Sequence, residues 1–500
     1  MVRLWEPFLL PAKAGMSREL QGRDEGAMVR ILLIQPNLSD GIGFRLAASP
    51  EPLHLELIAA TVPEHEVRIL DMRLDGDLES ALTSFQPQMV AITTLTPEVY
   101  TARNVLQQVK EFSNEVFTVV GGHHATLVPQ DFFLPQVDAV AVGEGEIMFR
   151  ELVQAVADRR RLENVPNLAW QDRDGTFVQN RRREGRIDLG NLPMPRRDLT
   201  ESYRNEYFFL FDQPDTSVAT SRGCPFRCNF CSIHEFYHGS TNQMPPRRVL
   251  SEIATVSTDH ITFVDDNFLV NHDRESVIAD LIRAEGIRKR FSMECRTDSI
   301  VRHPELVEKW VEVGLYAVLL GLEGGSDQIL KSVGKSSNVG TNNQAIQILQ
   351  DHGVIIWGAF LVDPDWTAGD FQRLRDYVRE KKITHTQFTI LTPLPGTQLY
   401  RDRCHELLTH DYSCFDTLHA VLPTRLPREE FYRHFASLYR QTDIGPYYDL
   451  VQSGKMTIQN CKRGKAMLDA AADWEQYLEK DPVLGERSTS RGVGDSLTDR

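Results

Sequence analysis

Cys224, Cys228 and Cys231 lie on one short loop with the spacing Cys-x3-Cys-x2-Cys. Iron–sulfur clusters are held by cysteine thiolates, and a [4Fe–4S] cluster has four irons that need ligands. The spacing therefore predicts a [4Fe–4S] cluster in which this loop ligates three irons. Because no fourth cysteine follows at short range, the fourth iron is left open for a ligand that is not protein. That arrangement is typical of a catalytic cluster rather than of an electron carrier.

Two other interpretations of these cysteines are open. A structural zinc site takes four ligands, and the nearby His234 or His238 could supply the fourth. The cysteines could also be buried thiols that lie together by chance. Zinc ligands usually come in recognisable pairs, so the spacing favours the iron–sulfur cluster.

The same loop resembles the signature of the radical S-adenosylmethionine (SAM) superfamily, including the aromatic Phe230 immediately before the third cysteine. In that family SAM binds the open iron through its amino and carboxylate groups. The resemblance implies that the reduced cluster gives one electron to SAM, whose C–S bond breaks to give a 5′-deoxyadenosyl radical. Such a radical takes a hydrogen atom from an sp3 carbon of the substrate.

The composition of the 500-residue chain narrows the classes of function. Seven cysteines, an odd number unevenly placed, indicate a reducing intracellular setting rather than a disulfide framework. A net charge of −15 argues against nucleic-acid binding, which needs a basic surface. No stretch approaches the roughly 20 apolar residues of a membrane span. The length predicts two or three domains, with residues 1–27 and 485–500 as disordered extensions.

Residues 28–160 alternate between apolar strands and helical stretches, which predicts a doubly wound, Rossmann-like parallel sheet of the α/β class. Such sheets bind ligands beyond the carboxyl ends of their strands, where glycine lets the backbone approach a ligand closely. Strands are expected at Val29–Ile34, Glu66–Asp71, Met89–Thr93, Val116–Gly121 and Ala139–Val142, and helices at Leu53–Val62, Leu78–Ser84 and Val99–Phe112. The candidate ligand contacts at the strand ends are Gly121, Gly122, His123, Gly143 and Glu144.

The loops that hold these residues, placed ahead of the cysteine loop, resemble the cobalamin-binding domain of B12-dependent radical SAM enzymes. The resemblance implies that cobalamin binds here, and a cofactor-free Rossmann-like domain is the alternative. Many cobalamin domains carry a histidine after the first strand that ligates cobalt from below, but loop 36–43 contains none. We therefore expect no lower nitrogen ligand from that loop. His123 and His124 are expected to contact the corrin or a phosphate rather than cobalt.

Residues 161–215 are expected to form a connector, an exposed hairpin with the basic run Arg181–Arg183 followed by an extended linker around Pro193 and Pro195. Between residues 216 and 399 six strands alternate with helices, which predicts a partial (β/α)6 barrel with its active site at the carboxyl ends of the strands. The strands are expected at Thr216–Thr220, His260–Asp265, Phe291–Arg296, Ala317–Gly321, Ile355–Leu361 and Thr386–Leu391.

Polar residues follow each barrel strand, either as solvated loop residues or, as we expect, as parts of one active site. The resemblance to radical SAM enzymes implies a task for each of them. Asp265 and Asp266 would accept hydrogen bonds from the SAM ammonium, and Arg296 would pair with the SAM carboxylate in bidentate fashion. Glu323, beside Gly324, would bind the ribose hydroxyls. Phe230 and the turn at Pro395 complete the predicted cofactor contacts, with the turn against adenine.

Residues 400–484 are expected to be helical, at Glu429–Leu450 and Lys462–Lys480. An aromatic face on the first helix is either part of the core, the usual role of such a stripe, or a cap over the barrel mouth that covers a large apolar substrate. The face consists of Phe431, Tyr432, Phe435, Leu438, Tyr439, Tyr447 and Tyr448. Cys404, Cys414 and Cys461 lack the spacing of ligands and are expected to be structural thiols.

The order of a cobalamin domain followed by a radical SAM barrel resembles the group of magnesium-protoporphyrin monomethyl ester cyclases, phosphinate methylases and hopanoid methylases. Within the group, Cys228–Tyr237 and Val362–Trp366 look most like hopanoid C-3 methylases. The resemblance implies a B12-dependent radical SAM methyltransferase in which methylcobalamin delivers a methyl group to an unactivated sp3 carbon, C-3 of a hopanoid lipid. The alternatives are an oxidative cyclase acting on a magnesium-porphyrin ester, a methylase with a non-lipid substrate, and a cobalamin sensor, which would need no cysteine triad.

The implied partners are an apolar polycyclic lipid and a one-electron donor such as flavodoxin or ferredoxin. Because such lipids reside in membranes, we expect a cytoplasmic enzyme with a peripheral contact at the inner face of the membrane. No nucleic-acid partner is expected.

Overall fold

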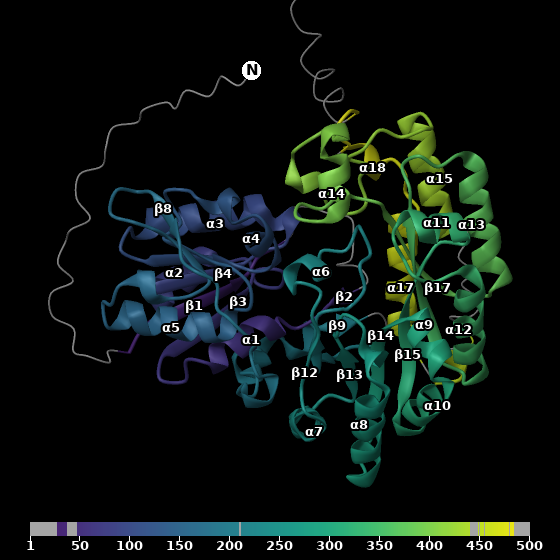
Figure 1. Cartoon of the computed structure of the whole chain (residues 1–500), viewed down its shortest axis with the longest axis horizontal. Coiled ribbons are helices and arrows are strands. Elements are labelled where there is room, and N and C mark those ends of the chain that lie inside the picture. The colour runs from purple at the N-terminus through teal and green to yellow at the C-terminus, as the bar shows by residue number, and fades with distance from the viewer. Residues whose placement is uncertain are drawn as a thin grey trace, which may run out of the picture.

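The computed structural model describes residues 28–37, 48–209, 212–440, 449, 451–454, 456–479 and 481–484. Two α/β lobes lie side by side, and the last helices of the chain pack on the second lobe (Figure 1). The predictions for residues 1–27 and 485–500, for Tyr447 and Tyr448, and for most of loop 36–43 lie outside the described residues.

The first lobe is built on one sheet with the strand order β3-β1-β4-β5-β6-β7-β8. Strands β3 to β6 are parallel, whereas β7 and β8 run antiparallel to their neighbours. The bounds are β1 Arg30–Gln35, β3 Glu66–Asp71, β4 Met89–Thr93, β5 Phe117–Gly121, β6 Ala139–Ala141, β7 Leu168–Gln171 and β8 Phe177–Gln179. The predicted connector hairpin is therefore present, but it extends the first sheet past the expected boundary at residue 160. This pairing between distant segments leaves no local signal in the sequence.

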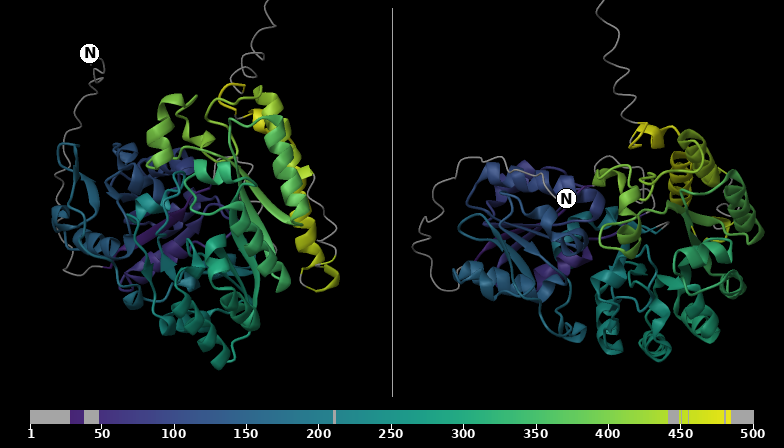
Figure 2. Two further views of the ribbon diagram at one scale, coloured as in Figure 1. Left: turned by 45° about the vertical axis from the view of Figure 1, so that its right-hand side comes forward. Right: turned by 45° about the horizontal axis from the view of Figure 1, so that its top comes forward.

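Helices cover both faces of this sheet, so the predicted doubly wound architecture is confirmed (Figure 2). Helices α1 (Leu53–Ala60) and α5 (Gly145–Ala157) bury their apolar residues on one face. Helices α2 (Leu78–Phe85) and α3 (Val99–Phe112) do so on the other. The strand order reverses direction between β1 and β4, and ligands of such folds bind at this switch point, outside the carboxyl ends of the strands.

The second lobe holds six parallel strands in the order β10-β13-β14-β15-β16-β17, which confirms the partial (β/α)6 barrel. Aromatic residues of the core pack where the sheet meets its helices; Phe263, for example, stacks on Phe291 and meets the edge of Trp310. The strands are β10 Asp215–Val218, β13 His260–Phe263, β14 Arg290–Arg296, β15 Leu315–Glu323, β16 Ile355–Val362 and β17 His385–Ile390. The outer helices are α7 Pro246–Thr255, α8 His272–Ala284, α10 Pro304–Val313, α12 Val339–Asp351 and α13 Ala368–Glu380.

The buried carboxylate of Glu51, just before α1 in the first lobe, contacts β10 of the second lobe. Glu51 is 4% exposed and accepts from the backbone N–H of Ser217 on β10 at 3.0 Å. It also pairs with Arg197 at 3.2 Å and with Arg204. Both arginines belong to the 3-10 segment Arg197–Glu206, which occupies the place predicted for an extended linker. The connection between the lobes is thus a buried ionic network rather than a free tether.

The C-terminal segment differs from its prediction in the number of helices and confirms it in the role of the aromatic face. The predicted helix Lys462–Lys480 is two helices, α17 (Ile458–Ala471) and α18 (Gln476–Glu479). The aromatic face of α15 (Arg428–Arg440) is core and not a cap over the barrel mouth, because Phe431, Phe435 and Tyr432 have no exposed surface. The Tyr439 hydroxyl donates to the backbone carbonyl of Phe388 on β17 at 2.8 Å. The period of the apolar residues predicted this face but not which barrel strands pack against it.

Within the part of the chain that the structure describes, no helix combines the length and the apolar character needed to cross a bilayer.

The core position of the α15 face predicts a stability effect. Phe435→Ala should destabilise the second lobe by about 3–5 kcal/mol, because a buried ring is lost and a cavity remains. Anaerobic thermal unfolding, followed by circular dichroism, should show a clearly lower midpoint. The exposed Glu429→Ala on the same helix should change stability by no more than about 0.5 kcal/mol. A Phe435→Ala protein with an unchanged midpoint but altered substrate selectivity would restore the cap interpretation.

Candidate functional site

The cysteine loop begins at a position that only glycine can occupy. Gly223 has φ +81°, and a Cβ there would lie 2.0 Å from the carbonyl oxygen of Ser240. Its backbone N–H donates to Asp266 Oδ2 at 2.7 Å, so the loop is fixed to the carboxyl end of β13 at its first residue. The chain enters the loop through β11 (Ser221–Arg222), which pairs with β12 (Asn242–Gln243).

The three thiols of the loop are free and lie near one another. Burial, together with the neighbouring Cys228 and Cys224, raises the pKa of Cys231 to about 12, so this thiol stays protonated until a metal displaces the proton. Three free thiols on one loop are the donor set that an iron–sulfur cluster takes.

The barrel holds the far side of the loop through the backbone of Asn229. Its N–H donates to Val333 O at 3.1 Å, and its carbonyl accepts from the N–H of Leu399 at 2.8 Å. Phe230 packs into an apolar cluster with Val333, Leu391 and Leu399. The cysteine loop therefore spans the carboxyl ends of the barrel strands, as predicted.

Two of the predicted SAM contacts have other partners in the structure. Asp265 is 1% exposed and accepts from the backbone N–H and hydroxyl of Thr220, at 3.0 and 2.8 Å, and from the Ser221 hydroxyl. Arg296 pairs with Asp298 at 2.9 Å, and its guanidinium lies 3.6 Å from the centre of the Phe226 ring. Both residues thus support the cysteine loop or the segment that leads into it, instead of presenting free polar groups to a ligand.

Two other acidic groups, Glu294 and Asp266, lie beside the loop. Burial, together with the nearby Asp266 and Asp265, raises the pKa of Glu294, on β14, to about 7. Burial likewise raises the pKa of Asp266 to about 6. A cationic ligand would stabilise the ionised form of both groups. No role was predicted for Glu294 from the sequence.

Glu323 and the Pro395 turn also lie at the barrel mouth. Glu323 has φ +57° at a bulge between β15 and β16, and one of its oxygens pairs with Lys335 at 2.5 Å. Gly324 follows it, and a Cβ at Gly324 would lie 2.7 Å from Ile329 Cγ2. Next to Pro395, Gly396 has φ +88°, and a Cβ there would lie 3.0 Å from Leu127 Cβ of the first lobe. The turn predicted to face adenine therefore also contacts the first lobe.

A buried ion pair joins the start of the cysteine loop to the first lobe. Arg222 donates to Glu144 Oε1 at 2.7 Å and also to Glu146, both at the end of β6. Arg222 holds the pKa of the buried Glu146 below its usual value despite the opposing effect of burial. The predicted cobalamin contact Glu144 thus reaches the residue next to Gly223. Sequence reasoning missed Arg222, although an arginine beside the cysteines and two acids in the facing loop were a signal.

A second contact joins the end of the cysteine loop to the first lobe. His123 Nε2 lies 2.7 Å from the hydroxyl of Ser232, and its ring stacks on Phe236 at 4.9 Å. Burial lowers the pKa of His123 to about 4, so the imidazole is neutral at pH 7. Both ring nitrogens of His124 are engaged, by Thr96 at 3.1 Å and Asp131 at 2.9 Å. His123 thus has a partner on the cysteine loop, and its expected contact with a corrin or a phosphate stays a prediction.

Gly143 and Leu95 are open at the carboxyl edge of the first sheet. Gly143 has φ +92°, its N–H donates to the Thr126 hydroxyl at 2.9 Å, and the nearest atom to a Cβ there would be 3.8 Å away. Leu95, after β4, is 52% exposed. Gly122 is instead confined by its own lobe, because a Cβ would lie 2.6 Å from Thr93 Oγ1, and Gly121 packs on Ala141. An apolar side chain and open backbone at this edge fit the flat apolar surface of a corrin.

The cysteine loop yields a direct prediction. Cys224→Ala, Cys228→Ala and Cys231→Ala should each abolish the [4Fe–4S] cluster, because each removes one of only three ligands. Iron and sulfide content and the visible absorption of the anaerobically reconstituted protein measure this. Cys404→Ala, which removes a free thiol outside the loop, should keep the full cluster. Full iron content in Cys231→Ala would show that the loop is not the cluster site.

The Arg222 ion pair yields a second prediction. Arg222→Met should destabilise the protein by about 3–5 kcal/mol, because Glu146 is left as a buried uncompensated charge. The double variant Arg222→Met/Glu146→Gln should recover part of this loss, since no charge then remains to be buried. Arg161→Met, at a largely exposed pair, is the matched control and should change little. Anaerobic thermal unfolding measures all three variants, and equal midpoints for wild type and Arg222→Met would contradict the assignment.

Comparisons with known proteins agree with this geometry. The model of the Radical SAM superfamily matches residues 218–378, and that of the B12 binding domain matches residues 41–153. The chain is 32% identical over 394 residues to the hopanoid C-3 methylase of Methylococcus capsulatus, which covers 76% of this chain and 74% of that protein. It is 26% identical over 437 residues to the anaerobic magnesium-protoporphyrin IX monomethyl ester cyclase of Rubrivivax gelatinosus, covering 83% and 77%.

The fold is shared with a solved cobalamin-dependent SAM radical enzyme. The structure of OxsB with aqua-cobalamin bound superposes with a TM-score of 0.68 at 15% identity, covering 91% of this chain and 72% of that one. The matched B12-binding region holds β5, β6 and their loops, and the matched radical SAM region holds the cysteine loop. The predicted fold class and cofactors are thereby confirmed. The chain belongs to the cobalamin-dependent radical SAM methyltransferases, whose cofactors are a [4Fe–4S] cluster, SAM and cobalamin.

Proposed function

We propose that this methyltransferase adds a methyl group to C-3 of a hopanoid lipid, an unactivated sp3 carbon. The observation that carries the proposal is the 32% identity to a hopanoid C-3 methylase over three quarters of both chains. When bound, the cluster and SAM supply a radical that removes a hydrogen atom, and cobalamin supplies the methyl group. The protein positions these groups and keeps water away from them.

We further propose which residues hold the cofactors. Cys224, Cys228 and Cys231 ligate three irons of the cluster. The carboxylates of Asp266 and Glu294 receive the SAM ammonium, because they lie at the barrel mouth with raised pKa values. The Glu323 oxygen that does not pair with Lys335 accepts from the ribose. The remaining proposed contacts are Phe230, Gly324 and Pro395 for SAM, and Gly121, Gly122, Gly143 and Glu144 for cobalamin.

The contacts between the lobes support transfer from cobalamin to a substrate beside the cluster. Arg222 precedes the cysteine loop and Ser232 follows it, and both bind residues at the carboxyl edge of the first sheet. The proposed cobalamin edge and the proposed cluster loop are therefore held next to each other (Figure 1). A substrate carbon between them would meet both reagents without moving.

The runner-up is an oxidative cyclase acting on a magnesium-porphyrin ester, in line with 26% identity to one such enzyme. The carboxylates of a porphyrin need cationic partners, for which Arg433 and Arg440 on α15 are candidates. In the structure, however, Arg433 lies over the Trp474 ring at 4.3 Å, and Arg440 donates to the carbonyl of Ala472 at 3.0 Å. Neither faces a porphyrin at the barrel mouth, so a lipid substrate is favoured.

The proposed setting follows from the substrate. A hopanoid resides in a lipid bilayer, so we propose a cytoplasmic enzyme that meets the inner membrane surface peripherally. The cluster needs a one-electron donor, for which we propose a flavodoxin or a ferredoxin.

Expression in a host that makes unmethylated hopanoids tests the proposal. Lipid extracts analysed by mass spectrometry should contain a hopanoid one methyl group heavier, with the methyl on the A ring. The Cys231→Ala protein, expressed in parallel, should give no such product, because it lacks the proposed cluster. Unchanged lipids together with consumption of a supplied magnesium-porphyrin ester would replace the hopanoid assignment with the cyclase.

A further inference from the structure

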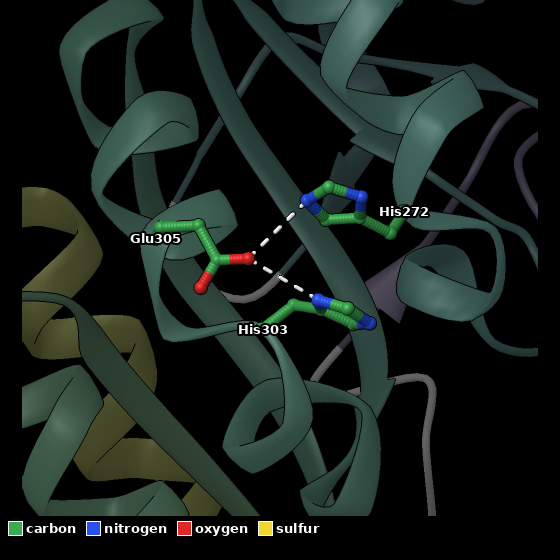
Figure 3. Close-up of side chains that lie close together, drawn as sticks. All are labelled: His272, His303 and Glu305. Atoms are coloured by element: carbon green, nitrogen blue, oxygen red, sulfur yellow. Dashed lines mark hydrogen bonds and ion pairs between the residues drawn. The ribbon is translucent and has the colours of Figure 1, made fainter.

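Two histidines and a glutamate meet outside the cofactor site. His272 is the first residue of α8, and His303 and Glu305 lie at the start of α10 (Figure 3). Candidate ligand atoms of all three lie within 4.8 Å of one another. The cofactor chemistry described above uses none of them.

The spacing of these atoms suits one tetrahedral metal ion. Glu305 Oε1 lies 3.3 Å from His272 Nε2 and 3.2 Å from His303 Nδ1. Two ligands of a tetrahedral zinc ion with bonds of about 2.05 Å are separated by about 3.3 Å. Both imidazoles thus place a ring nitrogen beside the same carboxylate oxygen. Because Glu305 is 60% exposed, its carboxylate is free to adjust its position when an ion binds.

The surroundings orient the two imidazoles. His272 uses its other nitrogen, Nδ1, to contact Asp273 Oδ1 at 3.1 Å. A ligating histidine characteristically donates its second ring N–H to a carboxylate in this way, which fixes the tautomer. The His272 and His303 rings also stack with centres 4.2 Å apart, so neither turns independently of the other. The carboxylates of Glu305 and Asp273 offset the positive ends of the two helices, which alone would disfavour a cation.

We propose that His272 Nε2, His303 Nδ1 and Glu305 bind one divalent transition-metal ion, with Zn2+ as the best fit to two imidazoles and a carboxylate. Water occupies the fourth position. The ion joins α8, which follows β13, to α10, which comes after β14. Asp266 follows β13 and Glu294 lies on β14, so the ion stiffens the scaffold behind these two residues. The site is independent of the proposed substrate.

Calorimetric titration of the cluster-loaded holoenzyme with Zn2+, under anaerobic conditions, tests the proposal. Wild type should bind one equivalent, and His272→Ala and His303→Ala should each weaken binding by about tenfold or more, because two protein ligands remain. His405→Ala is the matched control, since His405 is an exposed histidine 4.0 Å from Glu406 without a second imidazole. Its affinity should equal that of wild type. Unchanged cluster and cobalamin absorption verifies that each variant is folded.

X-ray absorption at the zinc edge identifies the ligands. The proposal requires nitrogen and oxygen scatterers with an imidazole pattern and no sulfur shell. Sulfur at about 2.3 Å would assign the zinc to cysteines and overturn the proposal. Absence of binding in wild type, or equal affinity in wild type and both histidine variants, would overturn it as well.

Discussion

The buried ion pair between Arg222 and the acids Glu144 and Glu146 sets the relation between the two lobes. It joins the residue before the cysteine loop to the loop after β6, so neither can move without the other. Burying the Glu146 carboxylate is costly unless it is paired, and Arg222 of the other lobe supplies its partner. His123 and Ser232 repeat the contact at the other end of the loop. The distance between the two cofactor regions therefore follows from contacts between protein groups alone.

The acids beside the cysteine loop have a different status. Asp265 accepts hydrogen bonds from Thr220 and Ser221, which lead into the cysteine loop. Asp266 and Glu294, in contrast, have raised pKa values of about 6 and 7. Keeping carboxylates in a buried mouth costs stability, which a positively charged ligand would restore. Arg296 supports the cysteine loop as Asp265 does, through its contacts with Phe226 and Cys228.

Local patterns in the sequence predicted the elements well but not their partners. Alternation of apolar residues located β3 and α3 to the residue, and cysteine spacing located the cluster loop. The partners of Asp265, Arg296 and His123 depend on contacts between segments far apart in the chain, which leave no periodic signal. For the same reason the hairpin of β7 and β8 was predicted as a connector although it completes the first sheet. The aromatic stripe of α15 predicted an apolar face in the core, and the structure confirms this role over the alternative of a cap.

The most direct test of the central claim is a product balance with SAM that carries a CD3 methyl group. Reconstituted holoenzyme, a low-potential electron donor and an unmethylated hopanoid are incubated anaerobically. The account predicts equal amounts of 5′-deoxyadenosine, S-adenosylhomocysteine and CD3-labelled lipid, because one SAM generates the radical and another supplies the methyl group. Labelled lipid without 5′-deoxyadenosine, or 5′-deoxyadenosine without transfer of the label, would contradict it.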